Sequence, residues 1–168
     1  MELKSIGIIH SPHQRAAGAP AQVAFAGGSV GTVEIFPEYS GGVKDLAGFE
    51  RIWLIYWFDR AVPARLEVTP YLDTEPRGIF ATRAPCRPNP LGFSPVRLIG
   101  VEGHLLRVAD IDILDGTPLI DIKPYVPLFD SFAAQRIGWC SRIADGVNGA
   151  ADDRFAVRDT KGLADGPP

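Results

Sequence analysis

Ile52-Trp53-Leu54-Ile55-Tyr56-Trp57-Phe58 is the stretch that decides the fold. All seven residues are apolar or aromatic, and such β-branched and aromatic side chains favour extended backbone. Because the run offers apolar side chains to both faces, it predicts a central strand that is buried on both sides. The run is too short for a membrane-spanning helix, which needs roughly 18 apolar residues.

Further short segments on either side alternate polar and apolar residues or are rich in β-branched residues. The expected strands cover residues 3–9, 31–36, 52–58, 65–71, 78–82, 96–101, 105–111 and 117–123. The strands at 96–101 and 105–111 form a predicted hairpin through the turn Glu102-Gly103-His104. Many short strands without long helices between them favour an antiparallel barrel or a sandwich, because closure removes exposed strand edges.

Little helix is expected outside these strands. Residues 39–48 hold at most one helical turn, and residues 132–144 hold one short helix. Residues 145–168 are rich in Gly, Ala and Asp and predict a weakly structured tail. The chain of 168 residues therefore indicates one mainly β domain at 3–130, followed by a C-terminal extension at 131–168.

The composition is that of a globular protein, with 46% hydrophobic and 22% charged residues. The net charge of −3 gives no whole-molecule attraction to nucleic acid, so RNA binding needs a local basic patch. We expect that patch around Arg65, Arg77, Arg87 and Arg97. The two cysteines are far apart and no apolar run reaches membrane length, which predicts a soluble, cytoplasmic protein.

Residues 78–97 form a stiff crossover with four prolines and three arginines. Proline fixes φ and removes a backbone donor, so we expect this segment to continue neither a sheet nor a helix. Guanidinium groups on a stiff loop bind a planar or anionic ligand with little conformational entropy left to lose. The alternative is a surface connection whose arginines are merely solvated.

Residues 110–118 carry three carboxylates, Asp110, Asp112 and Asp115, and end in an Asp-Gly turn. Two strand carboxylates at i and i+2 share a face, where they can contact ribose hydroxyls or an amine, or shift each other's pKa. The alternative is a solvated strand edge. Asp121 and Lys123 point to one side of the next strand, and their alternative is an ordinary exposed ion pair.

Other candidate motifs carry less weight. His10 and His13 have a spacing that suits metal only on a helix, which Pro12 forbids, so no metal site is expected. Cys86 has no neighbouring His-Asp pair and is expected to be a packing residue. The glycine-rich residues 26–31 lack the order and the βαβ setting of a Rossmann dinucleotide site.

The motifs, taken in order, match a known pattern. They are Ile6-Gly7-Ile8-Ile9-His10-Ser11-Pro12, Pro20-Ala21-Gln22, Leu46-Ala47-Gly48-Phe49-Glu50-Arg51-Ile52-Trp53-Leu54, Phe80-Ala81-Thr82-Arg83, Arg87-Pro88-Asn89-Pro90-Leu91-Gly92 with Ser94, Asp115-Gly116-Thr117-Pro118 and Asp121-Ile122-Lys123-Pro124-Tyr125. This pattern resembles the TsaA-like (YaeB-like, TrmO) family over about residues 3–130.

The resemblance implies a compact antiparallel β-barrel that binds S-adenosylmethionine and forms a homodimer with the cofactor near the subunit interface. It also implies an enzyme that methylates the exocyclic amine of N6-threonylcarbamoyladenosine, the modified adenosine beside the tRNA anticodon. The chain has Asp59 where the family usually has His.

The resemblance also assigns roles to individual residues. Those expected around the cofactor are Pro20, Gln22, Asp59, Arg60, Arg83, Leu91, Ser94, Asp110, Ile111, Asp112 and Asp115. Those expected on the substrate side are Arg87, Asn89, Lys123 and Tyr125. Arg97, from the expected basic patch, is a further expected substrate-binding residue. Asn89 and Tyr125 then orient the acceptor amine, while Lys123 or Arg87 holds the threonyl carboxylate or a phosphate.

Two other functions stay open at this point. One is a methyltransferase with the same cofactor and another acceptor, and the other is a non-catalytic nucleotide-binding module. All three functions need the arginine-rich crossover and the acidic segment after residue 109 to meet in one pocket.

Overall fold

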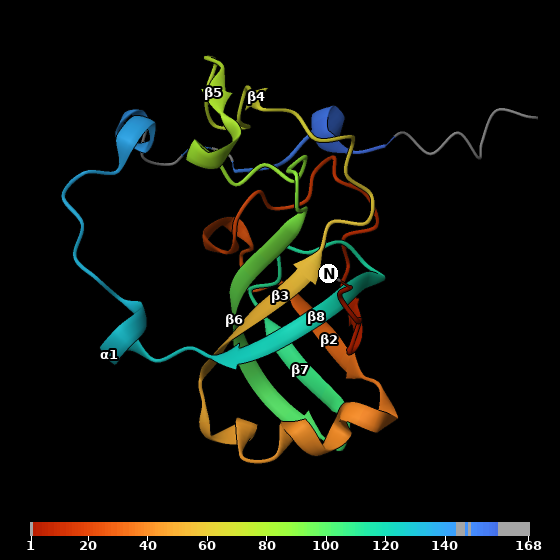
Figure 1. The fold of residues 1–168 in the computed structure, drawn as a ribbon. Coiled ribbons are helices and arrows are strands. Elements are labelled where there is room, and N and C mark those ends of the chain that lie inside the picture. The colour runs from red at the N-terminus through yellow and green to blue at the C-terminus, as the bar shows by residue number, and fades with distance from the viewer. Residues whose placement is uncertain (1, 144–146, 148, 158–168) are drawn as a thin grey trace, which may run out of the picture.

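The computed structural model describes residues 2–143, 147 and 149–157. Six antiparallel strands close into a barrel in the order β1-β2-β7-β6-β3-β8 (Figure 1). They are β1 Gly7–His10, β2 Val30–Ile35, β3 Arg51–Trp57, β6 Leu91–Glu102, β7 Leu105–Ala109 and β8 Thr117–Pro124. A separate small sheet pairs β4 Glu67–Val68 with β5 Arg77–Gly78. The expected mainly β fold is confirmed, and its architecture is a closed barrel rather than a sandwich.

Helices are short and lie in the connections. The only described α-helix is α1, Pro127–Asp130. The 3-10 helices are Val23–Phe25, Pro37–Val43, Leu46–Gly48, Ile79–Ala81, Gly138–Arg142 and Asp153–Phe155. Residues 39–48, expected to hold at most one turn, lie within a segment of two 3-10 helices at the lower end of the barrel in Figure 1. Within the described residues, no helix combines the length and apolar character needed to span a membrane.

The barrel core explains why β3 forms, and it corrects one expectation. Ile52, Leu54 and Tyr56 are buried, whereas Trp53 and the other alternate residues are only half-buried. A barrel strand turns one face to the core and the other outward, so β3 is not buried on both sides. On the outer face, Trp53 packs against Phe93 and Tyr125, with ring centroids 5.3 Å and 5.5 Å apart.

Two further strand predictions need correction. The segment 78–82 continues from β5 as a 3-10 helix, and only Glu67–Val68 of 65–71 is a strand. Conversely, β6 begins at Leu91, inside the crossover that proline was expected to keep out of the sheet. Pro95 is tolerated there because β7 pairs with β6 only from Arg97 onward, so Pro95 has no strand partner on that side.

The C-terminal extension has two described parts. Residues 125–143, here called the arm, leave the barrel after β8 and carry α1 and the 3-10 helix Gly138–Arg142 (Figure 1). Trp139 ties the arm back, its indole N–H donating to the Ala81 carbonyl at 2.8 Å. The expected short helix in 132–144 is therefore present as a 3-10 helix.

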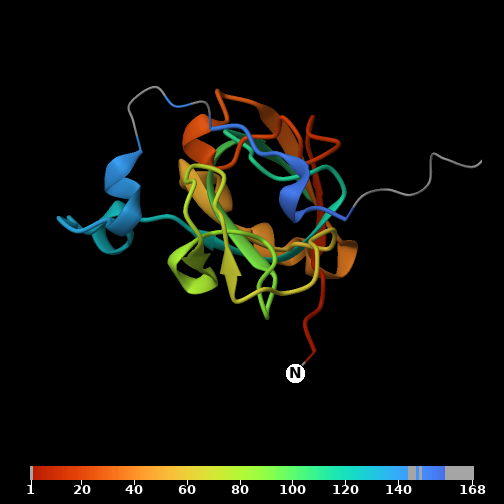
Figure 2. The same ribbon diagram turned by 90° about the horizontal axis from the view of Figure 1, so that it is seen from above.

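Residues 149–157, here called the strap, run across the open end of the barrel (Figure 2). They contain no regular element longer than three residues, yet they are well attached. The Ala21 N–H donates to the Gly149 carbonyl at 2.7 Å, and the Val62 N–H donates to the Phe155 carbonyl at 3.0 Å. Residues 149–157 of the expected weakly structured tail are therefore attached to the barrel, and the rest of the tail, 145–146, 148 and 158–168, lies outside the described residues.

Candidate functional site

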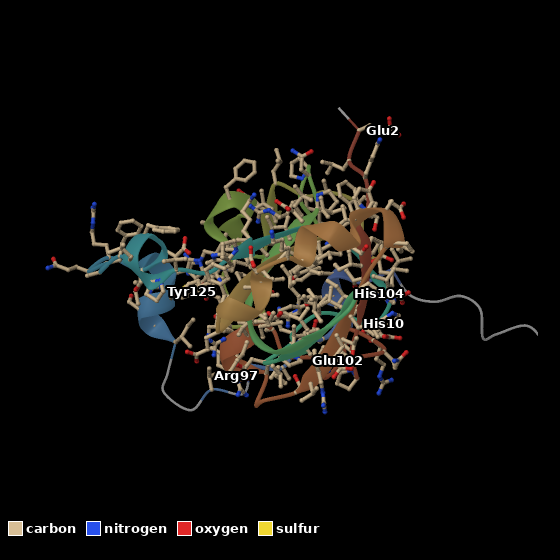
Figure 3. All side chains as sticks on the ribbon, turned by 90° about the horizontal axis from the view of Figure 1, so that it is seen from below. Glu2, His10, Arg97, Glu102, His104 and Tyr125 are labelled. Atoms are coloured by element: carbon tan, nitrogen blue, oxygen red, sulfur yellow. The ribbon has the colours of Figure 1, made fainter. Side chains whose placement is uncertain are left out.

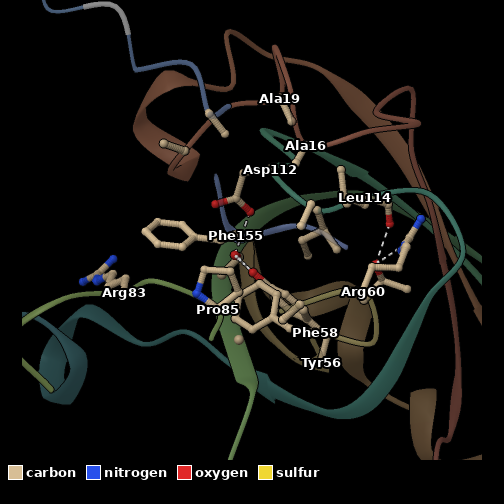
Figure 4. A pocket seen from close by; sticks show the side chains of 18 of the residues that line it. Ala16, Ala19, Tyr56, Phe58, Arg60, Arg83, Pro85, Asp112, Leu114 and Phe155 are labelled. Carbon is tan, nitrogen blue, oxygen red and sulfur yellow. Dashed lines mark hydrogen bonds between the residues drawn. The ribbon is translucent and has the colours of Figure 1, made fainter. Parts of the chain in front are cut away.

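The crossover and the acidic segment meet in one cavity at the open end of the barrel, as the sequence predicted (Figure 4). This barrel-mouth cavity has a volume of about 370 Å³. Its walls come from residues 16–22, the end of β3 with residues 58–61, residues 82–94, residues 112–117 and the strap. Segments far apart in sequence converge there because β3, β6 and β8 end or begin at this rim.

A hydrogen-bonded chain lies in the floor of the cavity. The Ser94 hydroxyl donates to Asp112 Oδ1 at 2.7 Å, and the Tyr56 hydroxyl lies 3.2 Å from Ser94 Oγ (Figure 4). Burial raises the pKa of Asp112 to about 6, against the opposing effects of the Ser94 hydrogen bond, Arg83 and His13. Burial likewise raises the pKa of Tyr56. Asp112 therefore loses its proton near neutral pH while Tyr56 keeps its own.

Arg60 lies at the rim, held by the turn that follows the acidic segment. One terminal nitrogen, Nη2, donates to the Asp115 carbonyl at 2.7 Å and to Thr117 Oγ1 at 3.0 Å. Its Nε is buried without a hydrogen-bond partner among the described residues, although Asp59 Oδ1 lies 3.4 Å away. Arg60 thus brings a guanidinium to the wall of the cavity, and this charge suits an anionic group of a ligand.

The two crossover arginines that line this cavity, Arg83 and Arg87, have different hydrogen-bond partners. Arg83 is exposed, donates to Gln22 Oε1 at 2.7 Å, and lies 5.4 Å from the Phe93 ring centroid. Arg87 instead stabilises the crossover itself, donating to the carbonyls of Ile79 at 3.0 Å and Thr82 at 2.9 Å. Arg83 is thus the crossover guanidinium that is better placed to reach a ligand.

A second hollow lies between the barrel wall and the arm. This arm cavity has a volume of about 860 Å³. Aromatic side chains from both sides line it: Phe80, Phe93, Tyr125 and Trp139. Gln22, Arg83, Ser94 and Asp112 line both cavities. The two hollows therefore share a boundary at the Ser94–Asp112 pair.

The structure brings together most of the expected cofactor residues, and with them two of the expected substrate residues. Those that line the barrel-mouth cavity are Pro20, Gln22, Asp59, Arg60, Arg83, Arg87, Asn89, Leu91, Ser94 and Asp112. Tyr125 lines the arm cavity, at the root of the arm (Figure 3).

Five expected site residues line neither cavity. Ile111 is fully buried in the core. Asp110 has a φ of 63° and pairs with Arg51 at 2.9 Å, with Arg97 Nε 3.7 Å from the same oxygen. Asp115 accepts from the Ser11 N–H, which lowers its pKa. Exposed Lys123 pairs with Asp121 at 2.8 Å.

These positions correct two expectations. Because β7 ends at Ala109, Asp110 and Asp112 do not share a strand face. The expected basic patch is not one free surface either, since Arg77 pairs with Asp73 at 2.7 Å and Arg97 lies beside Asp110.

In the described part of the chain, no three His, Cys, Asp or Glu side chains gather into a possible metal site. Buried Cys86 packs with Ile79 and Phe155, as expected of a packing residue.

Tyr56 and Phe155 are two of the cavity residues that the sequence did not predict. Tyr56 was read as one more apolar residue of β3, although a tyrosine that faces a core needs a partner for its hydroxyl, which was a usable signal. Phe155 is 4% exposed and lines both cavities from the strap. A lone phenylalanine in a polar, glycine-rich tail gave no periodic signal.

Known proteins are similar to this chain in sequence. The family model of the tRNA-methyltransferase O N-terminal domain matches residues 8–131. A probable S-adenosyl-L-methionine-binding protein of Pyrococcus abyssi is 52% identical over 150 residues, covering 89% of this chain and 82% of its own length. The tRNA (adenine(37)-N6)-methyltransferase of Escherichia coli is 33% identical over 140 residues, covering 77% of this chain and 60% of its own.

A solved structure agrees with the sequence matches. The crystal structure of TrmO from Pseudomonas aeruginosa superposes with a TM-score of 0.70 at 36% identity, covering 83% of this chain and 62% of that one. The chain thus spans about three fifths of the length of the Escherichia coli and Pseudomonas proteins. Since the matched domain takes up well over half of the chain, the protein belongs to the family defined by the tRNA-methyltransferase O N-terminal domain.

Proposed function

We propose that this protein is an S-adenosylmethionine-dependent tRNA methyltransferase whose acceptor is the exocyclic amine of N6-threonylcarbamoyladenosine beside the anticodon. The observation that carries the proposal is the pair of cavities that meet at Ser94 and Asp112 within a domain of this family. Methyl transfer needs a donor and an acceptor held in line, and two adjoining hollows meet that need. The Escherichia coli relative is named for methylation of adenine 37 at N6.

The barrel-mouth cavity suits the methyl donor. Its volume of about 370 Å³ lies within the roughly 300–1,000 Å³ typical of ligand sites. The positively charged Arg60 lines this cavity and offers a partner for the methionine carboxylate. Pro20, Gln22 and Leu91 line the wall where the nucleoside would lie. When bound, S-adenosylmethionine supplies an electrophilic methyl group on a positively charged sulfur.

The arm cavity suits the acceptor nucleoside. Phe93, Tyr125 and Trp139 offer aromatic faces, on which unpaired bases of an RNA loop stack. Asn89 is exposed and lines the barrel-mouth cavity, where its amide would orient the acceptor amine as the resemblance implies. Arg136 and Arg142 are exposed on the arm and give the acidic chain local positive charge for phosphates.

A homodimer in the cytoplasm, where tRNA is found, completes the proposal. The arm carries exposed apolar side chains that water does not favour, among them Leu128 at 88% and Phe132 at 80% exposure. A second copy of the chain that covers them would lie beside the arm cavity.

The test uses purified protein, S-adenosylmethionine and tRNA that carries threonylcarbamoyladenosine, with nucleosides analysed by mass spectrometry. We expect threonylcarbamoyladenosine to gain one methyl group, and tRNA that lacks the threonylcarbamoyl group to gain none. Methylation of a different nucleoside would favour the alternative of another acceptor. Cofactor binding by calorimetry without any methyl transfer would favour a non-catalytic nucleotide-binding module.

A further inference from the structure

The boundary between the two cavities is the place where donor and acceptor must meet. Nine residues line both hollows, and three of these carry an ionisable group: Tyr71, Arg83 and Asp112. An amine nitrogen that gains a methyl group must lose a proton, and an ionisable group at this boundary is placed to accept it.

Two of the three groups are unsuited to that task. Arg83 is a fixed cation with five donors and no acceptor. The Tyr71 hydroxyl donates to the Asp152 carbonyl at 3.2 Å, and burial raises its pKa, so it holds its proton. Asp112 is a carboxylate, and the Ser94 hydroxyl fixes its Oδ1 at 2.7 Å. Asp112 is the remaining acceptor.

We propose that Asp112 is the general base of the methyl transfer, taking the proton from the acceptor nitrogen. The inference rests on the proposed function. As the nitrogen lone pair forms the new N–C bond, the C–S bond breaks and its electron pair stays on sulfur, which becomes a neutral thioether. The proton leaves the nitrogen for the Asp112 carboxylate, and charge and atoms balance. Asp112 would therefore be a catalytic residue, whereas the resemblance placed it only at the cofactor.

The surroundings of Asp112 agree with this role. A pKa raised to about 6 leaves the group ionised at neutral pH but still basic enough to accept a proton. The charged and titratable groups that face it are Arg83 from the crossover, His13 from the N-terminal loop and Tyr56 from β3. His13 Nε2 lies 3.0 Å from the Ile111 carbonyl and is a neighbour rather than a direct partner.

The test compares the unaltered protein with Asp112→Asn in single-turnover methylation of modified tRNA across pH 5 to 8, at saturating S-adenosylmethionine. The amide keeps the shape and can still accept from Ser94. We expect the unaltered rate to rise with pH through about 6 and level off. The variant should be slower by roughly 10²–10⁴-fold and lose that rise, with cofactor affinity changed only a few-fold.

Two further variants serve as a control for the loss of a carboxylate and as a test of the Asp112 pKa. Asp45→Asn removes an exposed carboxylate at the far end of the barrel, at a φ of 65° that asparagine tolerates, and should match the unaltered protein. Ser94→Ala removes a hydrogen bond that lowers the Asp112 pKa, and should move the rise in rate to higher pH. A purely structural role for Ser94 would leave the position of that rise unchanged.

Several results would overturn the inference. The first is an Asp112→Asn rate within threefold of the unaltered rate with the same pH dependence. The second is a loss of cofactor affinity large enough to account for the whole loss of rate, which would make Asp112 a cofactor ligand. If the unaltered protein binds the cofactor but transfers no methyl group, the proposed function fails, and the assignment of the base fails with it.

Discussion

At the scale of single residues, the buried Asp112 carboxylate lowers the stability of the folded state when it is ionised. Its folded-state pKa of about 6 lies above the ordinary value of 3.8, so the folded state resists its ionisation. The cost is absent below about pH 4, grows between pH 4 and 6, and is complete above that range. The full shift corresponds to about 3 kcal/mol, which solvent in the cavity reduces.

We therefore expect Asp112→Asn to be more stable than the unaltered protein by about 1–2 kcal/mol at pH 7.5, with the gain vanishing towards pH 4. Urea unfolding at both pH values measures this, with Asp45→Asn as the control. A gain of the same size at both pH values, or a loss at pH 7.5, would contradict the pKa shift.

Residue types and motif order predicted much of the site, but not which side chains face it. Gln22, Arg83, Ser94 and Asp112 were expected near the cofactor and do line the cavity. Asp110 was expected there as well, yet it lies outside because β7 ends one residue before it. Where a strand ends depends on pairing with distant residues, which local sequence does not encode.

At the scale of elements, the strap is the part that the sequence did not reveal. It crosses the barrel mouth and places Phe155 against Ile79 and Cys86. Backbone hydrogen bonds join it to residues 18–21 and 60–62, and the side chains of Asp153, Arg154 and buried Phe155 add to this attachment, for which the local sequence gives no signal. The hairpin of β6 and β7 was predictable, by contrast, because a local turn sets its register.

Phe155→Ala should release the strap and weaken S-adenosylmethionine binding at least tenfold, because it removes a buried side chain from the cavity wall. Val157→Ala is the matched control, since Val157 is 60% exposed in the same segment. Calorimetric titration of both variants measures the effect. Equal affinity of the two variants would show that the strap does not support the cofactor site.

At the scale of the whole molecule, the strand pattern predicted a closed β architecture but left barrel and sandwich open. Alternation tells which face of a strand is buried, and both architectures bury one face of each strand. The pairing of β1 with β8, which joins residues more than 100 apart, closes the barrel and has no local signal.

The proposed homodimer makes a prediction at this scale. Phe132→Asp should turn a dimer into a monomer in sedimentation velocity, because it places a charge on an apolar contact. Gln135→Asp, at an exposed polar position of the same arm, should stay dimeric. An unaltered protein that sediments as a monomer at high micromolar concentration would exclude this assembly.

The proposed function depends most on where the methyl donor binds. A crystal structure with S-adenosylhomocysteine bound tests this directly. We predict the ligand in the barrel-mouth cavity, with its carboxylate at Arg60 and its sulfur facing the boundary at Ser94 and Asp112. Ligand density in the arm cavity, or anywhere outside the barrel mouth, would contradict the account.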